Sequence, residues 1–455
     1  MLVPFVIFIL SIVLYIIAPL KYDYMFCTLC FALCLFDVFI ILKSDLKKFG
    51  FFSFNTIFFF SFVFVSFIFP VMVYPTSEML GIMSLIDTHV ISKATALCQV
   101  AFSCYCLFYK IAANKYKKCL NQLLYKLPIR HNLIQKRIYL FALLAFVILI
   151  VKNISQNGFV EFTEAPYIVE LYEVAFAFIL ITNCSSVGKM STLHFYNLNK
   201  FPLLTASVIC IVFFIIGDRG PVIIIGLTIL SVYWMYVRRI RLIKLLPLLF
   251  IAVLAMFALR ITRATDESLS SGGWSTFIDA ASSSISGTSF IFLFSDLIYI
   301  CRELYFGFEE TVKNGLFYPE KIFILPFTPF PFLPTFLSDF LLGIPFDQLH
   351  SGTELNSYLA VQYGEKTSFG THCVIDIFMS WGIIGVICFF SVFGYLMALF
   401  SYKKNKSLYI QICFVIAMYL SLYTPRDQIY AMIRPMSYGL FFVWLSYGKL
   451  LKNRL

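Results

Sequence analysis

The chain has 455 residues and a net charge of +11, with 60% hydrophobic and only 13% charged residues. Soluble domains carry about 25% charged residues, and a soluble fold could not bury the 54 phenylalanines of this sequence. The composition therefore excludes an ordinary soluble enzyme and a disordered chain. It predicts a polytopic integral membrane protein.

Apolar stretches long enough to form membrane-spanning helices recur along the chain. A span needs about 20 mostly apolar residues, and continuous apolar runs favour helices over barrel strands, in which apolar and polar residues alternate. The first run lacks preceding basic residues and a small-residue cleavage site, so we expect an uncleaved helix. We predict an all-α fold with about twelve spans, near 2–20, 24–42, 54–74, 90–110, 138–152, 167–187, 202–216, 221–236, 245–259, 373–400, 408–423 and 429–448.

The distribution of lysine and arginine predicts the orientation in the membrane. With a cytoplasmic N-terminus, the cytoplasmic segments would be 43–51, 110–137, 188–200, 237–244, 401–407 and 449–455, which hold 23 of the 35 basic residues. The short outer loops hold only Lys21, Arg219, Arg426 and Arg434. Because basic residues are retained on the cytoplasmic side, we expect both termini to be cytoplasmic. The positive charge is then a topology signal that also suits anionic membrane lipid, and we expect no nucleic-acid partner.

One outer segment is much longer than the others. Residues 260–372 contain 12 of the 24 acidic residues, and their Pro-rich part, 326–334, cannot continue a helix. A long ordered loop is usually functional. We therefore divide the chain into spans one to nine (1–259), a large periplasmic loop (260–372) and spans ten to twelve (373–455).

The cysteines and histidines give no sign of a metal site. Most of the 13 cysteines lie in predicted spans, and Cys27-Thr-Leu-Cys30 lacks a second ligand pair, so we interpret them as small buried residues. Cys301 and Cys373 lie on the oxidising side, and the sequence leaves open whether they pair. Walker, dinucleotide-glycine and Asp-x-Asp motifs do not occur. We expect no metal and no cofactor.

Arginines on the outer face are the main candidates for ligand binding. Arg219 stands in the short break Ile216-Gly-Asp-Arg-Gly-Pro221, and Pro221 suits the first turn of the next helix. Arginine binds phosphate oxygens in a fixed fork, so several arginines on one face suggest a diphosphate ligand. The alternative is that they contact lipid headgroups or form structural pairs. The candidates are Arg219, Arg260, Arg263, Arg302, Arg426 and Arg434.

Four short motifs occur in an order that resembles a known family. They are Asn157-Gly-Phe-Val-Glu-Phe, Gly217-Asp-Arg-Gly-Pro-Val, the stretch 369–385 with Gly370-Thr-His and Gly382-Ile-Ile-Gly385, and Arg426-Asp-Gln with a basic residue eight positions on. In these motifs, and in the placing of the large loop, the chain resembles Wzy-type oligosaccharide repeat-unit polymerases. This family includes O-antigen and enterobacterial-common-antigen polymerases.

The resemblance implies a membrane glycosyltransferase of the GT-C type in the bacterial inner membrane. It implies an inverting, metal-independent transfer at the periplasmic face, from a glycan on undecaprenyl diphosphate to a lipid-linked repeat unit. Arg219, Arg260, Arg263, Arg426 and Arg434 would then stabilise the charge that develops on the departing diphosphate. A chain-length regulator protein is the expected partner.

The reaction also needs an acceptor for the sugar hydroxyl proton. His350 is the first candidate because its ordinary pKa is about 6.5, and His350-Ser-Gly resembles a segment of common-antigen polymerases. Glu354, His372 and Asp376 are its rivals, and Asp376 could instead hold an arginine or cap a helix. We interpret the acidic residues of the spans as packing or pairing groups; they are Asp37, Glu170 and Glu173.

Two other functions remain open. A flippase or exporter of lipid-linked glycans would also use arginines and many helices, but such proteins often show internal repeats, and none is visible here. An O-antigen ligase has a similar architecture and transfers glycan to lipid A core. The sequence separates polymerase from ligase poorly.

Overall fold

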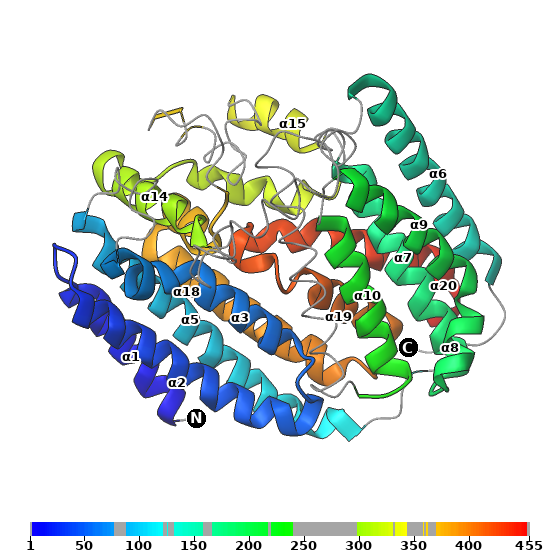
Figure 1. Ribbon diagram of the computed structural model, residues 1–455, viewed down its shortest axis with the longest axis horizontal. Coiled ribbons are helices and arrows are strands. Elements are labelled where there is room, and N and C mark those ends of the chain that lie inside the picture. Colours follow the sequence, from blue (N-terminus) through cyan, green and yellow to red (C-terminus); the bar gives the residue numbers. More distant parts are fainter. Residues whose placement is uncertain are drawn as a thin grey trace, which may run out of the picture.

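The computed structural model describes residues 2–76, 88–121, 125, 132–157, 166–216, 220–239, 298–330, 333–343, 358, 361–362 and 370–452. Within these residues, 86% of the structure is helical and no strand occurs. The expected all-α class is therefore confirmed for the described part (Figure 1).

Helices occupy each predicted span except 245–259, which lies outside the described residues. The α-helices are α1 (Leu2–Ile17), α2 (Tyr24–Phe49), α3 (Phe54–Ser66), α5 (Thr88–Tyr116), α6 (Asn132–Asn157), α7 (Pro166–Val187), α8 (Thr192–Leu198), α9 (Lys200–Ile216), α10 (Gly220–Tyr236), α14 (Cys301–Asn314), α15 (Leu333–Leu337), α18 (Cys373–Lys403), α19 (Leu408–Leu420) and α20 (Ile433–Lys452). Short 3-10 and π turns are η1 (Phe69–Val73), η2 (Tyr74–Thr76), η3 (Lys117–Asn121), η6 (Pro319–Phe323), η7 (Leu325–Phe327), η8 (Ser338–Leu342), η9 (Thr424–Arg426) and η10 (Ile429–Met432).

Five helices are long and apolar enough to cross a membrane, or up to seven if two bent pairs each count as one span. The five lie within α2, α5, α6, α7 and α18, and three shorter apolar helices are α1, α10 and α19. These helices are consistent with an all-α membrane protein. The number of twelve spans stays a prediction. The span predicted at 54–74 bends by 48° between Ser66 and Phe69, where Pro70 removes a helical hydrogen bond.

Polar caps fix where several of these helices begin. Asp23, Ser53 and Ser407 each accept a hydrogen bond from the backbone N–H three residues further on, which satisfies one of the free donors of a helix N-terminus. Gly50 ends α2 with a φ of 82°, a conformation that glycine adopts without strain. Helix α2 thus continues well beyond residue 42, where the apolar run ends.

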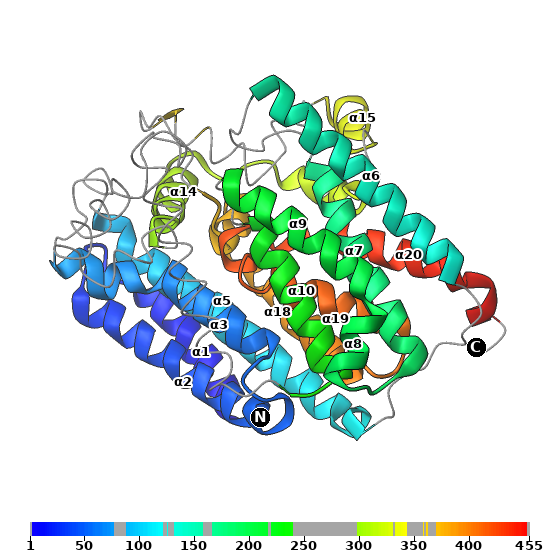
Figure 2. The same cartoon turned by 45° about the vertical axis from the view of Figure 1, so that its right-hand side comes forward.

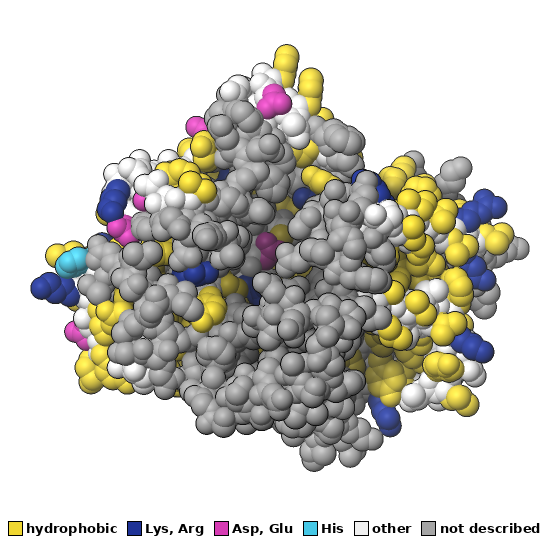
Figure 3. Space-filling model, turned by 45° about the horizontal axis from the view of Figure 1, so that its top comes forward, with side chains coloured by type: hydrophobic (Ala, Val, Ile, Leu, Met, Phe, Trp, Pro, Cys, Tyr) yellow, Lys and Arg dark blue, Asp and Glu magenta, His cyan; other side chains and the backbone are white. Residues whose placement is uncertain are grey.

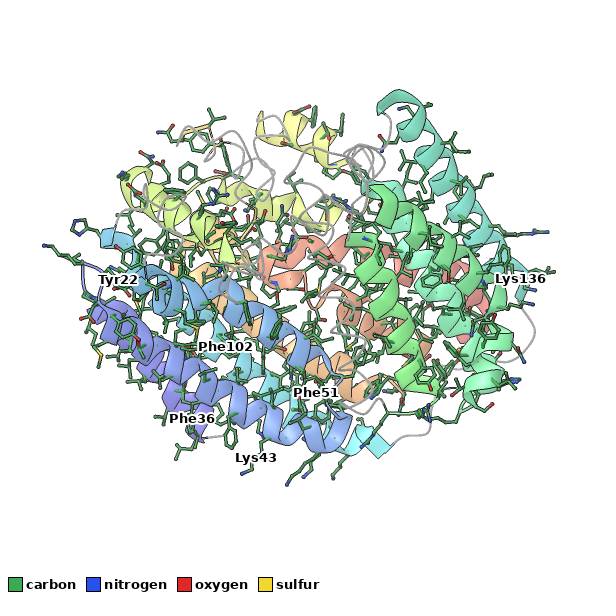
Figure 4. All side chains as sticks on the ribbon, in the orientation of Figure 1. Tyr22, Phe36, Lys43, Phe51, Phe102 and Lys136 are labelled. Atoms are coloured by element: carbon green, nitrogen blue, oxygen red, sulfur yellow. The ribbon has the colours of Figure 1, made fainter. Side chains whose placement is uncertain are left out.

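The helices form two groups with α18 between them (Figures 1 and 2). Helix α5 packs against α1, α2 and α18, while α7, α10, α19 and α20 pack together in the second group. In the first group, Phe102 of α5 is fully buried and Phe36 of α2 is 48% exposed, so α2 presents an apolar face to the surroundings (Figure 4). A Cβ at Gly394 of α18 would lie 2.4 Å from the carbonyl oxygen of Tyr105, so these two backbones almost touch.

Segments that we predict on the cytoplasmic side lie at one end of the bundle. Arg239 Nη2 donates to Lys48 O at 2.8 Å, and the N–H of Tyr125 donates to Asn405 O at 3.0 Å. The described part of the large loop lies at the opposite end, where α14 packs against the first half of α18 (Figure 1). In the Pro-rich part, the described residues 326–330 and 333–334 form short turns and the start of α15.

Candidate functional site

A group of charged and polar side chains lies where α14, η6, the start of α18 and the loop after α19 meet. We call it the outer cluster, because it lies at the end of the bundle that we predict to be periplasmic. Its members are Glu303, Lys321, His372, Asp376, Arg426 and Asp427, and the buried Arg302 precedes Glu303 on α14. Figure 3 turns this end toward the reader and shows acidic and basic side chains set back between the atoms around them. The packing of α14 on α18 is tight: the rings of Phe308 and Phe378 stack 5.0 Å apart.

A buried ion pair joins the large loop to α18. Lys321 is 2% exposed, and its Nζ lies 3.4 Å from both the Oδ1 and the backbone oxygen of Asp376. The ring of Trp381 lies 4.9 Å from the same Nζ, and its indole N–H donates to Pro319 O at 2.9 Å. Burial lowers the pKa of Lys321, and the Asp376 carboxylate opposes that shift. Asp376 therefore pairs with a basic side chain, which is Lys321 and not an arginine.

Glu303 is the second buried carboxyl of the outer cluster. Its Oε2 accepts a hydrogen bond from the backbone N–H of His372, and the residue has no exposed surface. Burial, and then the neighbouring Asp376 charge, raise the pKa of Glu303 well above its usual range. Its Oε1 accepts no hydrogen bond in the described part of the chain. A buried carboxyl with a raised pKa and an unused oxygen can take up a proton.

His372 is fixed in its neutral form as the N-cap of α18. Its Nδ1 accepts from the Val374 N–H at 3.2 Å, so the ring hydrogen must be on Nε2, which lies 3.2 Å from Ser66 Oγ. Burial lowers the pKa of His372 to about 3. Both ring nitrogens are thus engaged, and the geometry supports a capping role for this rival of His350.

The loop after α19 contacts Gly220, the first residue of α10. The guanidinium of Arg426 lies over the ring of Tyr423, 5.4 Å from its centroid, and Tyr423 OH donates to Gly220 O at 3.4 Å. Burial raises the pKa of the adjacent Asp427 to about 6. Gly220 belongs to the Gly-Asp-Arg-Gly-Pro motif, so two segments more than 200 residues apart meet here.

Arg434 occupies the first turn of α20 and forms an ion pair. Its Nη1 lies 3.0 Å from Glu170 Oε1, and its guanidinium stacks 4.2 Å from the ring centroid of Tyr167. Its buried Nε has no hydrogen-bond partner among the described residues. The arrangement agrees with the interpretation of Glu170 as a pairing group, and it leaves one edge of the guanidinium for an anion.

The structure describes only some of the residues expected from the sequence. Asp376, Arg426 and Arg434 are described, whereas Arg219, Arg260, Arg263, His350 and Glu354 lie outside the described residues. Cys301 and Cys373 are both buried free thiols. Within the described part, no group of three or more His, Cys, Asp or Glu side chains could hold a metal ion.

Two members of the outer cluster, Glu303 and Lys321, were not expected from the sequence. The signal for Glu303 was weak: an adjacent Arg-Glu pair inside the otherwise apolar stretch 301–308. Lys321 stands in a polar loop, and only the packing of η6 against α18 buries it. No protein-family model, curated protein or solved structure matches this chain.

Proposed function

We propose that this protein polymerises oligosaccharide repeat units linked to undecaprenyl diphosphate, at the periplasmic face of the bacterial inner membrane. One observation carries the proposal. Three of the segments that resemble polymerase motifs converge, because Tyr423 contacts Gly220 and Asp427 interacts electrostatically with Asp376 of α18. Arginines that bind one diphosphate must lie within a few ångströms of it, so this convergence is what the reaction requires.

The chemistry assigns different roles to the charged side chains. Undecaprenyl diphosphate leaves with additional negative charge, and Arg426, with the predicted Arg219, Arg260, Arg263 and Arg434, would stabilise that charge in a site that excludes water. The acceptor hydroxyl must lose a proton. Glu303 joins His350 and Glu354 as a candidate acceptor, because its raised pKa and unused Oε1 favour proton uptake.

Synthesis in a purified system tests the activity directly. The protein in detergent, given lipid-linked repeat units, should produce a ladder of glycans, and it should do so in EDTA because arginine replaces a cation at the diphosphate. A ladder that vanishes with chelator and returns with magnesium would refute the metal-independent mechanism. A single product size at all times would refute polymerisation itself.

Gene deletion separates this function from its two alternatives. Loss of a polymerase leaves one repeat unit on the surface lipid, loss of a ligase leaves none, and loss of a flippase keeps the precursor inside the cell. We expect the first result. The second or third would replace the proposal by ligase or flippase.

Reporter fusions test the proposed location of the site. Tags at residues 120, 240 and 404 should report the cytoplasm, and tags at 270 and 340 the periplasm, because the basic segments are expected inside. A periplasmic report from residue 120 would place the outer cluster on the wrong side for this reaction.

A further inference from the structure

Helix α2 carries two buried aspartates with opposite surroundings. Asp37 and Asp45 are each 1% exposed. At a rise of about 1.5 Å per residue, Asp37 lies roughly 20 Å from either end of α2, near its middle, whereas Asp45 lies in its last two turns. The first is therefore surrounded by the membrane-spanning bundle, and the second is close to its basic end.

Asp45 has the partners of an ionised carboxylate. Its Oδ2 accepts from Asn55 Nδ2 at 2.6 Å and from Tyr109 OH at 2.8 Å. The Asn55 amide is itself oriented by Tyr105 OH, which donates to its oxygen at 2.5 Å. These two fixed donors stabilise the charged form of this group and oppose the effect of its burial.

Asp37 has no such pair of donors. The polar side chain beside it is Gln99 of α5, whose amide interacts with the Asp37 carboxyl. Apart from this contact, neither Asp37 oxygen has a hydrogen-bond partner among the described residues. Gln99 Nε2 donates to Ser11 Oγ at 3.3 Å, and the single Ser11 hydroxyl hydrogen goes to Ile7 O at 2.8 Å. In this orientation of the amide, Gln99 Oε1 is also buried without a donor among the described residues.

Among the described residues, the groups that interact with Asp37 include no positive charge that could compensate a carboxylate. Its titratable neighbours are the thiols of Cys34 on α2 and Cys106 on α5, and neither is a cation. An unpaired carboxylate among apolar groups is so unfavourable that the group takes up a proton instead. One added hydrogen on Asp37 would also supply a donor for Gln99 Oε1.

We infer that Asp37 is a proton-binding site inside the membrane bundle, a neutral carboxylic acid whose O–H donates to Gln99 Oε1. The ligand is a proton, and the site is formed by α1, α2 and α5 together. This inference does not depend on the proposed polymerase activity, because none of its residues belongs to the outer cluster.

Infrared spectroscopy of two matched variants tests the inference. The wild-type protein at neutral pH should show a protonated-carboxyl carbonyl band that shifts in D2O and is missing from Asp37→Asn. The band should persist in Asp45→Asn. Any separate band from the buried Glu303 carboxyl should remain in both variants. Since an asparagine amide can also donate to Gln99 Oε1, Asp37→Asn should keep the wild-type Tm, whereas Asp45→Asn faces two donors and should lower Tm by several degrees.

Three results would overturn the inference. The first is a set of protonated-carboxyl bands that is the same in the wild-type protein and in Asp37→Asn. The second is a band that appears only after sodium is removed, which would assign a metal cation to the site. The third is an Asp37→Asn variant whose Tm falls as far as that of Asp45→Asn.

Discussion

The two ends of the molecule bury a lysine in different ways. At the outer end, Lys321 lies beside the carboxylate of Asp376. At the basic end, Lys404 is 9% exposed, and its Nζ lies 3.7 Å from the ring centroid of Trp234, with the rings of Phe49 and Phe414 within 5.0 Å. Lys404 takes part in no ion pair of the described residues. Lys321 thus has a carboxylate partner as well as the ring of Trp381, whereas Lys404 has aromatic rings and no carboxylate partner among the described residues.

This difference in how the two lysines are stabilised indicates at which end the charged side chains depend on one another. An ion pair that loses one partner leaves the other charge buried and uncompensated, so charges at the outer end depend on one another. An aromatic cage leaves no charge behind when its cation is removed. The outer end is therefore the one suited to binding and releasing a charged ligand, and the basic end is suited to holding loops together.

The largest effect should come from removing an outer arginine. Arg426→Ala should lower polymerisation by a factor on the order of 10²–10³, as for other groups that stabilise developing charge. Arg239→Ala, at the basic end, should leave the rate nearly unchanged. Glycan ladders from equal amounts of inserted protein measure both, and full-length polymer from Arg426→Ala would remove this arginine from the site.

The next effect concerns the stability of the buried ion pair. Lys321→Met should lower the free energy of unfolding by about 3–5 kcal/mol, because the buried Asp376 carboxylate loses the cation 3.4 Å from it. Adding Asp376→Leu should recover much of that loss. Denaturant unfolding in detergent gives both values, and a double variant no more stable than Lys321→Met would show that the two side chains are not coupled.

A pH effect should follow from His372. Its pKa falls from 6.5 to about 3 on folding, so the unfolded chain binds the proton first as the pH decreases. The stabilisation is complete above about pH 6.5 and is lost toward pH 3, which amounts to about 2 kcal/mol by pH 5. His372→Asn keeps a capping oxygen and should flatten this dependence. Equal slopes of Tm against pH in both proteins would contradict the assignment.

The smallest effect should be at the aromatic cage. Lys404→Met loses cation–π attraction of about 1–2 kcal/mol and gains apolar burial of similar size. The net change in unfolding free energy should therefore stay within about 1 kcal/mol. If Lys404→Met lowered the unfolding free energy as much as Lys321→Met does, the proposed difference between a charge-paired and an aromatic-caged lysine would be wrong.

Hydrophobicity predicted the positions of the helices but not their ends or bends. Helix α2 runs on to Phe49 because Gly50 ends it, and a residue count of the apolar run cannot show this. The contacts within the site were harder to predict than the helices, because Lys321 and Asp376 are 55 residues apart in the sequence. Hydrophobic periodicity contains no information on which loop residue meets which helix. The arginine-bearing motifs, His372 and Asp376 could be named in advance from their residue types, but their contacts could not.

The close approach of Gly394 to Tyr105 has a consequence for how the protein is made. Helix α18 leaves the ribosome about 290 residues after α5, which takes on the order of 15–60 s at typical synthesis rates. During that time α5 lies in the bilayer without the helix that covers it. In the complete protein, the Cys104 thiol donates to the Ile387 carbonyl oxygen at 3.3 Å. Before α18 is inserted, this thiol contacts lipid or another helix instead. Assembly of the first group of helices is therefore complete only after the C-terminal part of the chain has been inserted.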